Sequence, residues 1–163
     1  MAISEKDLLG ASNHRLEELF RSSTAGDVPT GPTEGTGLVC TGTWPARPIA
    51  VLVRLLLWQG KVFAADGRSL VNRVTPLDAL AIGALVYPGP SLMDDRDCIV
   101  IDYSKTSRVF GAVRDEIRQV APDLFLGVVW FLGRKTCWFA LRVPRPDSEP
   151  ASRPGVTTAT RSA

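Results

Sequence analysis

Short apolar runs separated by polar turns occupy the middle of the chain. Such runs, rich in β-branched and aromatic residues and bounded by Gly, Pro, Asp or Ser, are typical of β-strands. The predicted strands are 36–44, 61–66, 69–75, 80–90, 98–103, 123–132 and 136–143. Asp66-Gly67 and the segment "GRK" at 133–135 each join two of these runs, and both predict tight β-hairpins.

Three further segments have helical spacing of their apolar residues. "SNHRLEELFRS" (12–22) has Ser12 or Asn13 as its N-cap, and "PIAVLVRLLLW" (48–58) is apolar on most of its circumference. In 107–120, the positions Phe110, Val113 and Ile117 recur at helical intervals. The pattern therefore predicts an α+β fold: a mostly antiparallel sheet or barrel of six to seven strands, covered by about three helices.

The length and the ends of the chain define its organisation. At 163 residues the sequence suits one ordinary domain, predicted over 36–143. Residues 1–35 contribute a helix and a loop rich in Gly, Pro and Thr. The segment 144–163 has several prolines and no aromatic residue, so it buries too little apolar surface to offset its ordering entropy, and we expect a disordered tail.

Charge and composition exclude several classes of function. The net charge is +2 and the basic residues are scattered, which is not the pattern of a nucleic-acid-binding surface. The apolar run inside 48–60 is interrupted by Arg54 and falls short of the ~20 residues that cross a bilayer. We expect no transmembrane segment, and whether 48–58 lies in the core or at a membrane interface stays open.

The cysteines and the N-terminus bear on the compartment. Cys40, Cys98 and Cys137 are odd in number and far apart, and each lies among apolar residues. We expect three free, buried thiols and therefore a reduced, cytoplasmic protein. The first residues, "MAISEKDLLG", lack the apolar core of a signal peptide.

The strand patterns raise the question of what covers each face of the sheet. In "LFLGVVWFL" both faces are apolar, whereas an open antiparallel sheet usually has one polar face. One face is expected to pack on helices and the other to line a cavity for an apolar molecule. The alternative is a sheet packed between helices 48–58 and 107–120. The residues expected to line the cavity are Val100, Tyr103, Val128, Trp130, Phe139 and Trp58.

The segment "IVIDYSKTS" (99–107) carries the candidate chemistry. Asp102 alternates with Cys98 and Val100, so it shares a face with apolar residues. An inward carboxylate there has a raised pKa and is able to act as an acid or base, with Arg114 as a second polar group. The alternative is an Asp102 that ends the strand, accepting backbone N–H bonds or pairing with Arg114.

Metal and cofactor motifs are weak by comparison. The chain has one histidine, His14, in the first turn of a predicted helix. The "DDRD" segment, which contains Asp94 and Asp95, lacks the spacing of a calcium loop and predicts a turn. We expect neither a cofactor nor a metal site.

The layout resembles that of small calycin-type proteins, the lipocalin-like barrels. The resemblance covers roughly 36–143 and is carried by "WQGKVF", "GPSLMDDRDCIVIDYSKTS" and "VRDEIRQVAPDLFLGVVWF", with Gly42-Thr43-Trp44 approximating an N-terminal GxW signature. It implies a cup that holds a lipophilic small molecule. Some barrels of this broad type also carry out lyase, isomerase or hydratase chemistry.

Three hypotheses of function follow. The first is a binding module for a hydrophobic small molecule. The second is a cofactor-free enzyme of the lyase or isomerase type that uses Asp102. The third is an interaction subunit without a cavity, which forms a homodimer through an exposed sheet edge and predicts a filled core and an exposed apolar patch.

Overall fold

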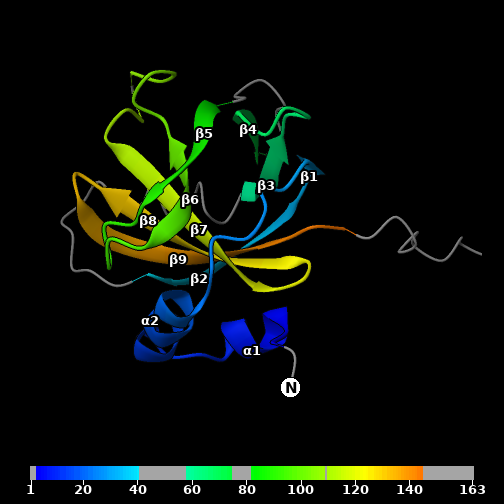
Figure 1. Ribbon diagram of the computed structural model, residues 1–163, viewed down its shortest axis with the longest axis vertical. Helices are drawn as coiled ribbons and strands as arrows, with labels where there is room; N and C mark the ends of the chain where they lie inside the picture. The colour runs from blue at the N-terminus through cyan, green and yellow to red at the C-terminus, as the bar shows by residue number, and fades with distance from the viewer. Residues whose placement is uncertain (1–2, 41–57, 75–81, 109, 145–163) are drawn as a thin grey trace, which may run out of the picture.

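The protein folds as a nearly closed antiparallel β-barrel with two short helices packed on one side (Figure 1). This computed structural model describes residues 3–40, 58–74, 82–108 and 110–144. Within these residues there are nine strands and two helices. The strands are β1 (Gly31–Pro32), β2 (Glu34–Cys40), β3 (Trp58–Phe63), β4 (Ser69–Val74), β5 (Gly83–Pro90), β6 (Asp97–Asp102), β7 (Val113–Ala121), β8 (Leu124–Phe131) and β9 (Arg134–Arg142).

One stretch of chain closes the barrel. The strands follow the order β1-β3-β4-β5-β6-β7-β8-β9-β2, so the two ends of the sheet are β1 and β2. These two strands are consecutive in sequence, separated by Thr33 alone. Because β1 pairs with β3 while β2 pairs with β9, the segment 31–40 joins the two edges of the sheet. Closure of this kind removes the exposed edges that otherwise invite aggregation.

The seam between Thr33 and Lys61 is tightly bonded. Thr33 N donates to Lys61 O at 2.8 Å, the Thr33 hydroxyl donates to the same oxygen at 2.8 Å, and Lys61 N donates to Thr33 Oγ1 at 3.1 Å. Gly60 makes this approach possible, since its φ is 132° and a Cβ there would meet Thr33 O at 2.0 Å. Only glycine fits a position with this backbone angle and this contact.

Two apolar clusters stabilise the fold, one on each side of the barrel wall. The interior cluster fills the barrel, and its buried members are Phe63, Leu70, Ala84, Val86, Ile99, Ile101, Tyr103, Ile117, Phe125, Phe139 and Leu141. The outer cluster lies between the helices and the outer face of β8 and β9. Its buried members are Leu8, Leu16, Leu19, Phe20, Leu124, Leu126, Val128, Trp130, Trp138 and Ala140.

The helices that cover the outer cluster are α1 (Glu5–Leu9) and α2 (Asn13–Ser22). Of the two predicted caps, Ser12 caps α2, with its hydroxyl accepting a hydrogen bond from Arg15 N at 3.2 Å. The ring of Phe20 meets Trp138 edge to face at 5.7 Å between centroids, and the Trp138 indole N–H donates to Asn13 Oδ1 at 2.7 Å. These contacts attach α2 to β9.

Arg118 is a fully buried arginine on the outer face of β7. Its guanidinium makes two bonds to the Asp94 carboxylate, at 2.8 and 2.6 Å, and three to the backbone carbonyls of Phe20, Arg96 and Asp97. All five N–H donors of an arginine are therefore used. Arg118 thus fixes the turn before β6 to the end of α2 and to the barrel.

The predicted helix over 107–120 is wrong, because 113–121 forms β7. Val113, Asp115 and Ile117 share a face, as the alternation of a strand requires. The other face carries Arg114, Glu116 and Arg118, which stay at least half-buried because they bind the 90–97 segment. Polar residues on a covered face hid the alternation and left an apparent helical spacing.

Most other sequence predictions hold where the structure describes them. The hairpin at Asp66-Gly67 joins β3 and β4, the hairpin at 132–133 joins β8 and β9, and strands lie at 83–90 and 97–102. The strand count of six to seven and the count of three helices are corrected to nine and two within the described residues. Residues 48–57 and the predicted tail from 145 lie outside the described residues, and Trp58 begins β3.

The expectation of three free thiols is also wrong. Cys137 is disulfide-bonded, whereas Cys98 is free and buried. In the β2–β9 ladder, the backbone of Cys40 lies directly opposite Cys137. The sequence spacing hid this proximity, because the pairing joins the beginning of the barrel to its last strand.

The Asp94–Arg118 pair predicts a specific pH dependence of stability. The hydrogen bonds from Arg118 hold the pKa of Asp94 below its ordinary value of 3.8. The pair therefore stabilises the fold above about pH 4, and this contribution is lost as the pH falls through the lower folded-state pKa. In urea titrations, we expect the stability difference between wild type and Asp94→Asn to shrink steadily below about pH 4.

The matched control is Asp95→Asn, since Asp95 is exposed in the same turn and its φ of 56° is one that asparagine tolerates. Its stability difference from wild type is expected to stay small and flat over the same range. A constant difference for Asp94→Asn would contradict the account.

Candidate functional site: a polar cluster at one end of the barrel

Four polar side chains meet inside the barrel, and we call them the polar cluster: Lys61, Asn72, Tyr103 and Asp115. They come from β3, β4, the residue after β6, and β7. Each is buried, with exposed fractions of 2% for Lys61, 9% for Asn72, 4% for Tyr103 and 5% for Asp115. They lie beside an interior that is otherwise apolar, so they are the chemically distinctive part of the barrel.

Lys61 is at the centre of the polar cluster. Its ammonium group donates to Asn72 Oδ1 at 2.8 Å, to Tyr103 Oη at 2.7 Å and to Asp115 Oδ2 at 2.9 Å. Tyr103 Oη in turn lies 3.1 Å from Asp115 Oδ2, to which it donates. The Asn72 amide N–H₂ donates to Tyr103 Oη and to the Ile82 carbonyl, both at 3.0 Å. The polar groups are therefore linked into one continuous network.

Strand register brings these residues together. Lys61 and Asn72 are direct partners in the β3–β4 ladder. Ile101, two residues before Tyr103, is the direct partner of Asp115 in the β6–β7 ladder. Because alternate residues of a strand face the same side, Lys61 follows Phe63 into the interior, and Tyr103 follows Ile101.

The electrostatics of the cluster keep both Lys61 and Tyr103 protonated. Burial lowers the pKa of Lys61, but the nearby Asp115 carboxylate and Tyr103 outweigh this effect and hold the pKa above its ordinary value. Burial, with help from Asp115, raises the pKa of Tyr103 to about 12, although Lys61 and Asn72 oppose the shift. At neutral pH the cluster holds an ammonium and a neutral phenol.

Half-buried apolar side chains pack next to the polar cluster. Val113 is two residues before Asp115 on the same face of β7, and Val129 is the direct partner of Asp115 on β8. Both pack against the interior cluster, as do Ile82 and Phe110, and all four remain partly exposed. This end of the barrel therefore combines a polar centre with apolar walls that solvent reaches in part.

Phe139 forms another wall of this end. Its ring lies over Gly127, where a Cβ would come within 2.2 Å of a ring carbon. Lys61 Nζ is 5.5 Å from the centroid of the Phe139 ring and 5.4 Å from that of Tyr103. The ammonium group thus has aromatic faces beside it as well as hydrogen-bond acceptors.

The residues predicted to line one cavity are divided between two places. Tyr103 and Phe139 lie inside the barrel next to Lys61. Val128 and Trp130 lie on the outer face of β8, beneath the helices. Val100 is on the outer face of β6, opposite Tyr87, and the side chain of Trp58 lies outside the described residues.

Asp102 and Arg114 are direct partners on β6 and β7, but both are on the outer face. Asp102 accepts hydrogen bonds from Ser104 N at 2.8 Å and from the Tyr87 hydroxyl at 3.2 Å. Partial burial raises the pKa of Asp102, but these hydrogen bonds outweigh it and leave the pKa below its ordinary value. Arg114 donates to Glu116 at 2.8 Å. The environment resembles a strand end rather than an apolar interior.

Sequence reasoning missed three of the four cluster residues: Lys61, Asn72 and Asp115. The available signal was the alternation of side chains along a strand: Lys61 is two residues from Phe63, and Asn72 is two residues from Leu70, so each shares a face with an interior residue. An isolated lysine in a strand is usually assigned to solvent, because buried lysines are rare. Asp115 was hidden by the helix assigned to its segment.

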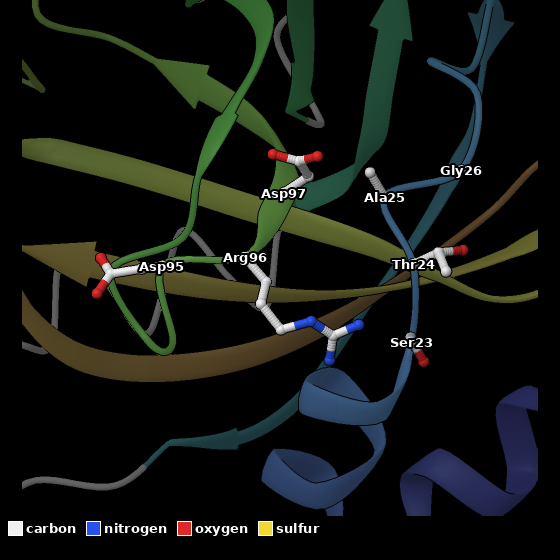
Figure 2. A pocket seen from close by; sticks show the side chains of 7 residues that line it. All are labelled: Ser23, Thr24, Ala25, Gly26, Asp95, Arg96 and Asp97. Carbon is white, nitrogen blue, oxygen red and sulfur yellow. The ribbon is translucent and has the colours of Figure 1, made fainter.

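A separate pocket of about 510 Å³ opens on the surface between the segment after α2 and the turn before β6 (Figure 2). It is lined by Ser23, Thr24, Ala25, Gly26, Asp95, Arg96 and Asp97. Its open, mixed polar lining differs from the enclosed polar cluster. Among the residues that the structure describes, no group of three or more His, Cys, Asp or Glu side chains is placed to hold a metal ion.

Comparison with known proteins supports the fold and gives no further assignment. A solved structure of a protein from Thermomonospora curvata is similar to this chain, with a TM-score of 0.56 and 17% sequence identity. The match covers 83% of this chain and 89% of that protein. No family model and no curated protein matches the sequence. The likeness shows a shared barrel fold, and membership of the calycin family stays a prediction.

Helices within the described residues are all too short and too polar to cross a membrane.

The Lys61–Asp115 pair predicts strong coupling between two substitutions. Removing one member of a buried ion pair leaves an uncompensated charge, at a cost of about 3–5 kcal/mol of stability. We expect Lys61→Met to lose about this amount in urea unfolding, and Lys61→Met/Asp115→Leu to recover a substantial part of it.

Lys135→Met is the control, because Lys135 forms a more exposed pair with Glu17 at 2.5 Å. Its expected cost is below about 1 kcal/mol. Additive losses in the double variant would show that Lys61 and Asp115 are not energetically coupled.

Proposed function

We propose that this protein is a binding module for a small amphipathic molecule, held at the end of the barrel that contains the polar cluster. The observation that carries this proposal is a hydrogen-bonded, charged cluster inside an apolar barrel, flanked by apolar side chains that remain partly exposed. Ligand pockets typically have this composition: mostly apolar walls with a few convergent polar groups.

The energetics of burial support this proposal. A buried ion pair often contributes less to stability than well-packed apolar residues of the same volume. The interior of this barrel is otherwise filled with Ile, Leu, Val and Phe side chains, so an apolar residue in place of Lys61 would suit the core. Polar groups retained in such a place are candidates for function.

The protonation states favour binding over chemistry. A nucleophilic or basic lysine needs a lowered pKa, whereas the pKa of Lys61 is raised by its Asp115 partner. Tyr103, with a pKa of about 12, is likewise a poor base at neutral pH. Groups of this kind hold and orient a polar group of a ligand without exchanging protons with it.

The proposal is tested with N-phenyl-1-naphthylamine, a dye whose fluorescence rises in apolar sites. We expect saturable binding to the wild type and at least about tenfold weaker binding to Val129→Trp, which places a much larger side chain next to Asp115. Val71→Trp is the matched control, since Val71 faces outward on β4. Equal binding by all three proteins, or no binding to the wild type, would contradict the proposal.

A second candidate is an interaction subunit that pairs with a second copy of this chain. Its basis is an outer apolar surface formed by Val62, Val71, Leu85 and Tyr87, each between 36% and 41% exposed. Val62 and Val71 are direct cross-strand partners, and Leu85 and Tyr87 continue the same face on the neighbouring strand. Contiguous exposed apolar side chains are typical of interaction sites.

Self-association through this surface predicts a dimer that a single charge disrupts. Light scattering of the wild type should give the mass of two chains, and Val71→Lys should give one. Val71 lies near the middle of the surface, so a charge there is expected to be buried unpaired in the dimer. A wild-type monomer at high concentration would exclude this candidate.

A further inference from the structure

We infer that the ligand of the polar cluster is a hydrogen-bond donor, such as an alcohol, an amide N–H or an amine, rather than a carboxylate or phosphate. This inference rests on the proposed binding function and specifies the class of molecule. It follows from an account of which donors and acceptors in the cluster are already used.

The donors of the cluster are occupied by partners within it and by the Ile82 carbonyl. An ammonium group has three N–H donors, and Lys61 directs one each to Asn72, Tyr103 and Asp115. The hydroxyl proton of Tyr103 goes to Asp115 Oδ2. The two amide protons of Asn72 go to the Ile82 carbonyl and to Tyr103 Oη. An anionic group would therefore have to break existing bonds to obtain a donor.

Asp115 retains an acceptor. Both of its side-chain hydrogen bonds within the described residues, from Lys61 and from Tyr103, end on Oδ2. The second carboxylate oxygen, Oδ1, has no hydrogen-bond partner among those residues, and the Asp115 side chain is 7% exposed. A carboxylate oxygen accepts up to two hydrogen bonds. Within the described residues the fully buried side-chain atom without a partner is Trp130 Nε1, so the unbonded Oδ1 of Asp115 keeps some access to solvent and is open to a donor from a ligand.

Asp115 also lies beside the apolar walls. Val129 is its direct partner in the β7–β8 ladder, and Val113 is its neighbour on the same face of β7. A ligand whose apolar part packs on these two half-buried side chains would bring its polar end to Asp115. A hydroxyl or N–H at that end donates to Oδ1, whereas a carboxylate there is repelled by the same oxygen.

The presence of Lys61 does not reverse this preference. An interior lysine on its own favours an anionic ligand, but here Asp115 at 2.9 Å already compensates the charge of the ammonium. The pair is close to neutral as a unit, so it offers no net positive charge to an incoming anion. The ligand class is set by the group that still has an unused site, and that group is Asp115.

The test measures displacement of N-phenyl-1-naphthylamine by three eight-carbon probes that differ only in their polar end: 1-octanol, n-octylamine and octanoate. We expect 1-octanol and n-octylamine to displace the dye from the wild type at least about tenfold more tightly than octanoate. The alcohol and the amine gain a hydrogen bond to Asp115, whereas the carboxylate is repelled by it. Octanoate binding equally or more tightly overturns the inference and leaves the binding function intact. Displacement by none of the three, with the dye bound, also overturns it.

Failure of the dye itself to bind is a different result, since it removes the proposed function as well. A variant adds a second readout: Asp115→Asn replaces one carboxylate oxygen with an N–H₂ donor, so octanoate should gain relative to 1-octanol. Because this substitution leaves Lys61 without its counter-charge, Lys61→Met/Asp115→Asn serves as the folded alternative, checked by circular dichroism. In either variant, an unchanged ranking of the three probes overturns the role of Asp115.

Discussion

The closure of the barrel depends on the contact between Thr33 and the backbone of Lys61. Before Thr33 the chain pairs with β3, and after Thr33 it pairs with β9. Three hydrogen bonds fix Thr33 to the Lys61 backbone. The positive φ of Gly60 allows the two segments to approach this closely. Lys61, whose backbone makes this contact, directs its side chain into the interior, where it reaches Asp115. Closure of the fold and placement of the polar cluster are therefore consequences of one local arrangement.

Two buried cations illustrate opposite uses of charge in this protein. Arg118 is on the outside of the wall, with its five donors matched to one carboxylate and three carbonyls, and it attaches the 94–97 turn and α2 to the barrel. Lys61 is inside, in a network whose carboxylate still has an acceptor. Every donor of Arg118 has an acceptor, which is consistent with a purely structural role. The network around Lys61 is incomplete, and it lies beside partly exposed apolar walls, which is why we place the site there.

Local patterns were sufficient to predict the strands and hairpins, because alternation and the Asp66-Gly67 turn are signals carried by neighbouring residues. They failed over 113–121, where the outward side chains of Arg114, Glu116 and Arg118 are covered by the 90–97 segment rather than by solvent. They also failed for Lys61, since a strand lysine is ordinarily placed outside. Barrel closure and the proximity of Cys137 to Cys40 required pairings between distant parts of the sequence. Tyr103 and Phe139 alternate with apolar residues in their strands and do lie inside the barrel, whereas their role in binding a ligand stays a prediction.

The central claim is that the polar cluster and its apolar walls hold a small molecule. The most direct measurement is native mass spectrometry of freshly purified protein, followed by solvent extraction of any bound compound. The account predicts a co-purifying molecule at near-stoichiometric amount in the wild type, and its loss from Val129→Trp but not from Val71→Trp. A wild-type spectrum that shows only the mass of the chain, together with no uptake of added apolar compounds, would contradict it.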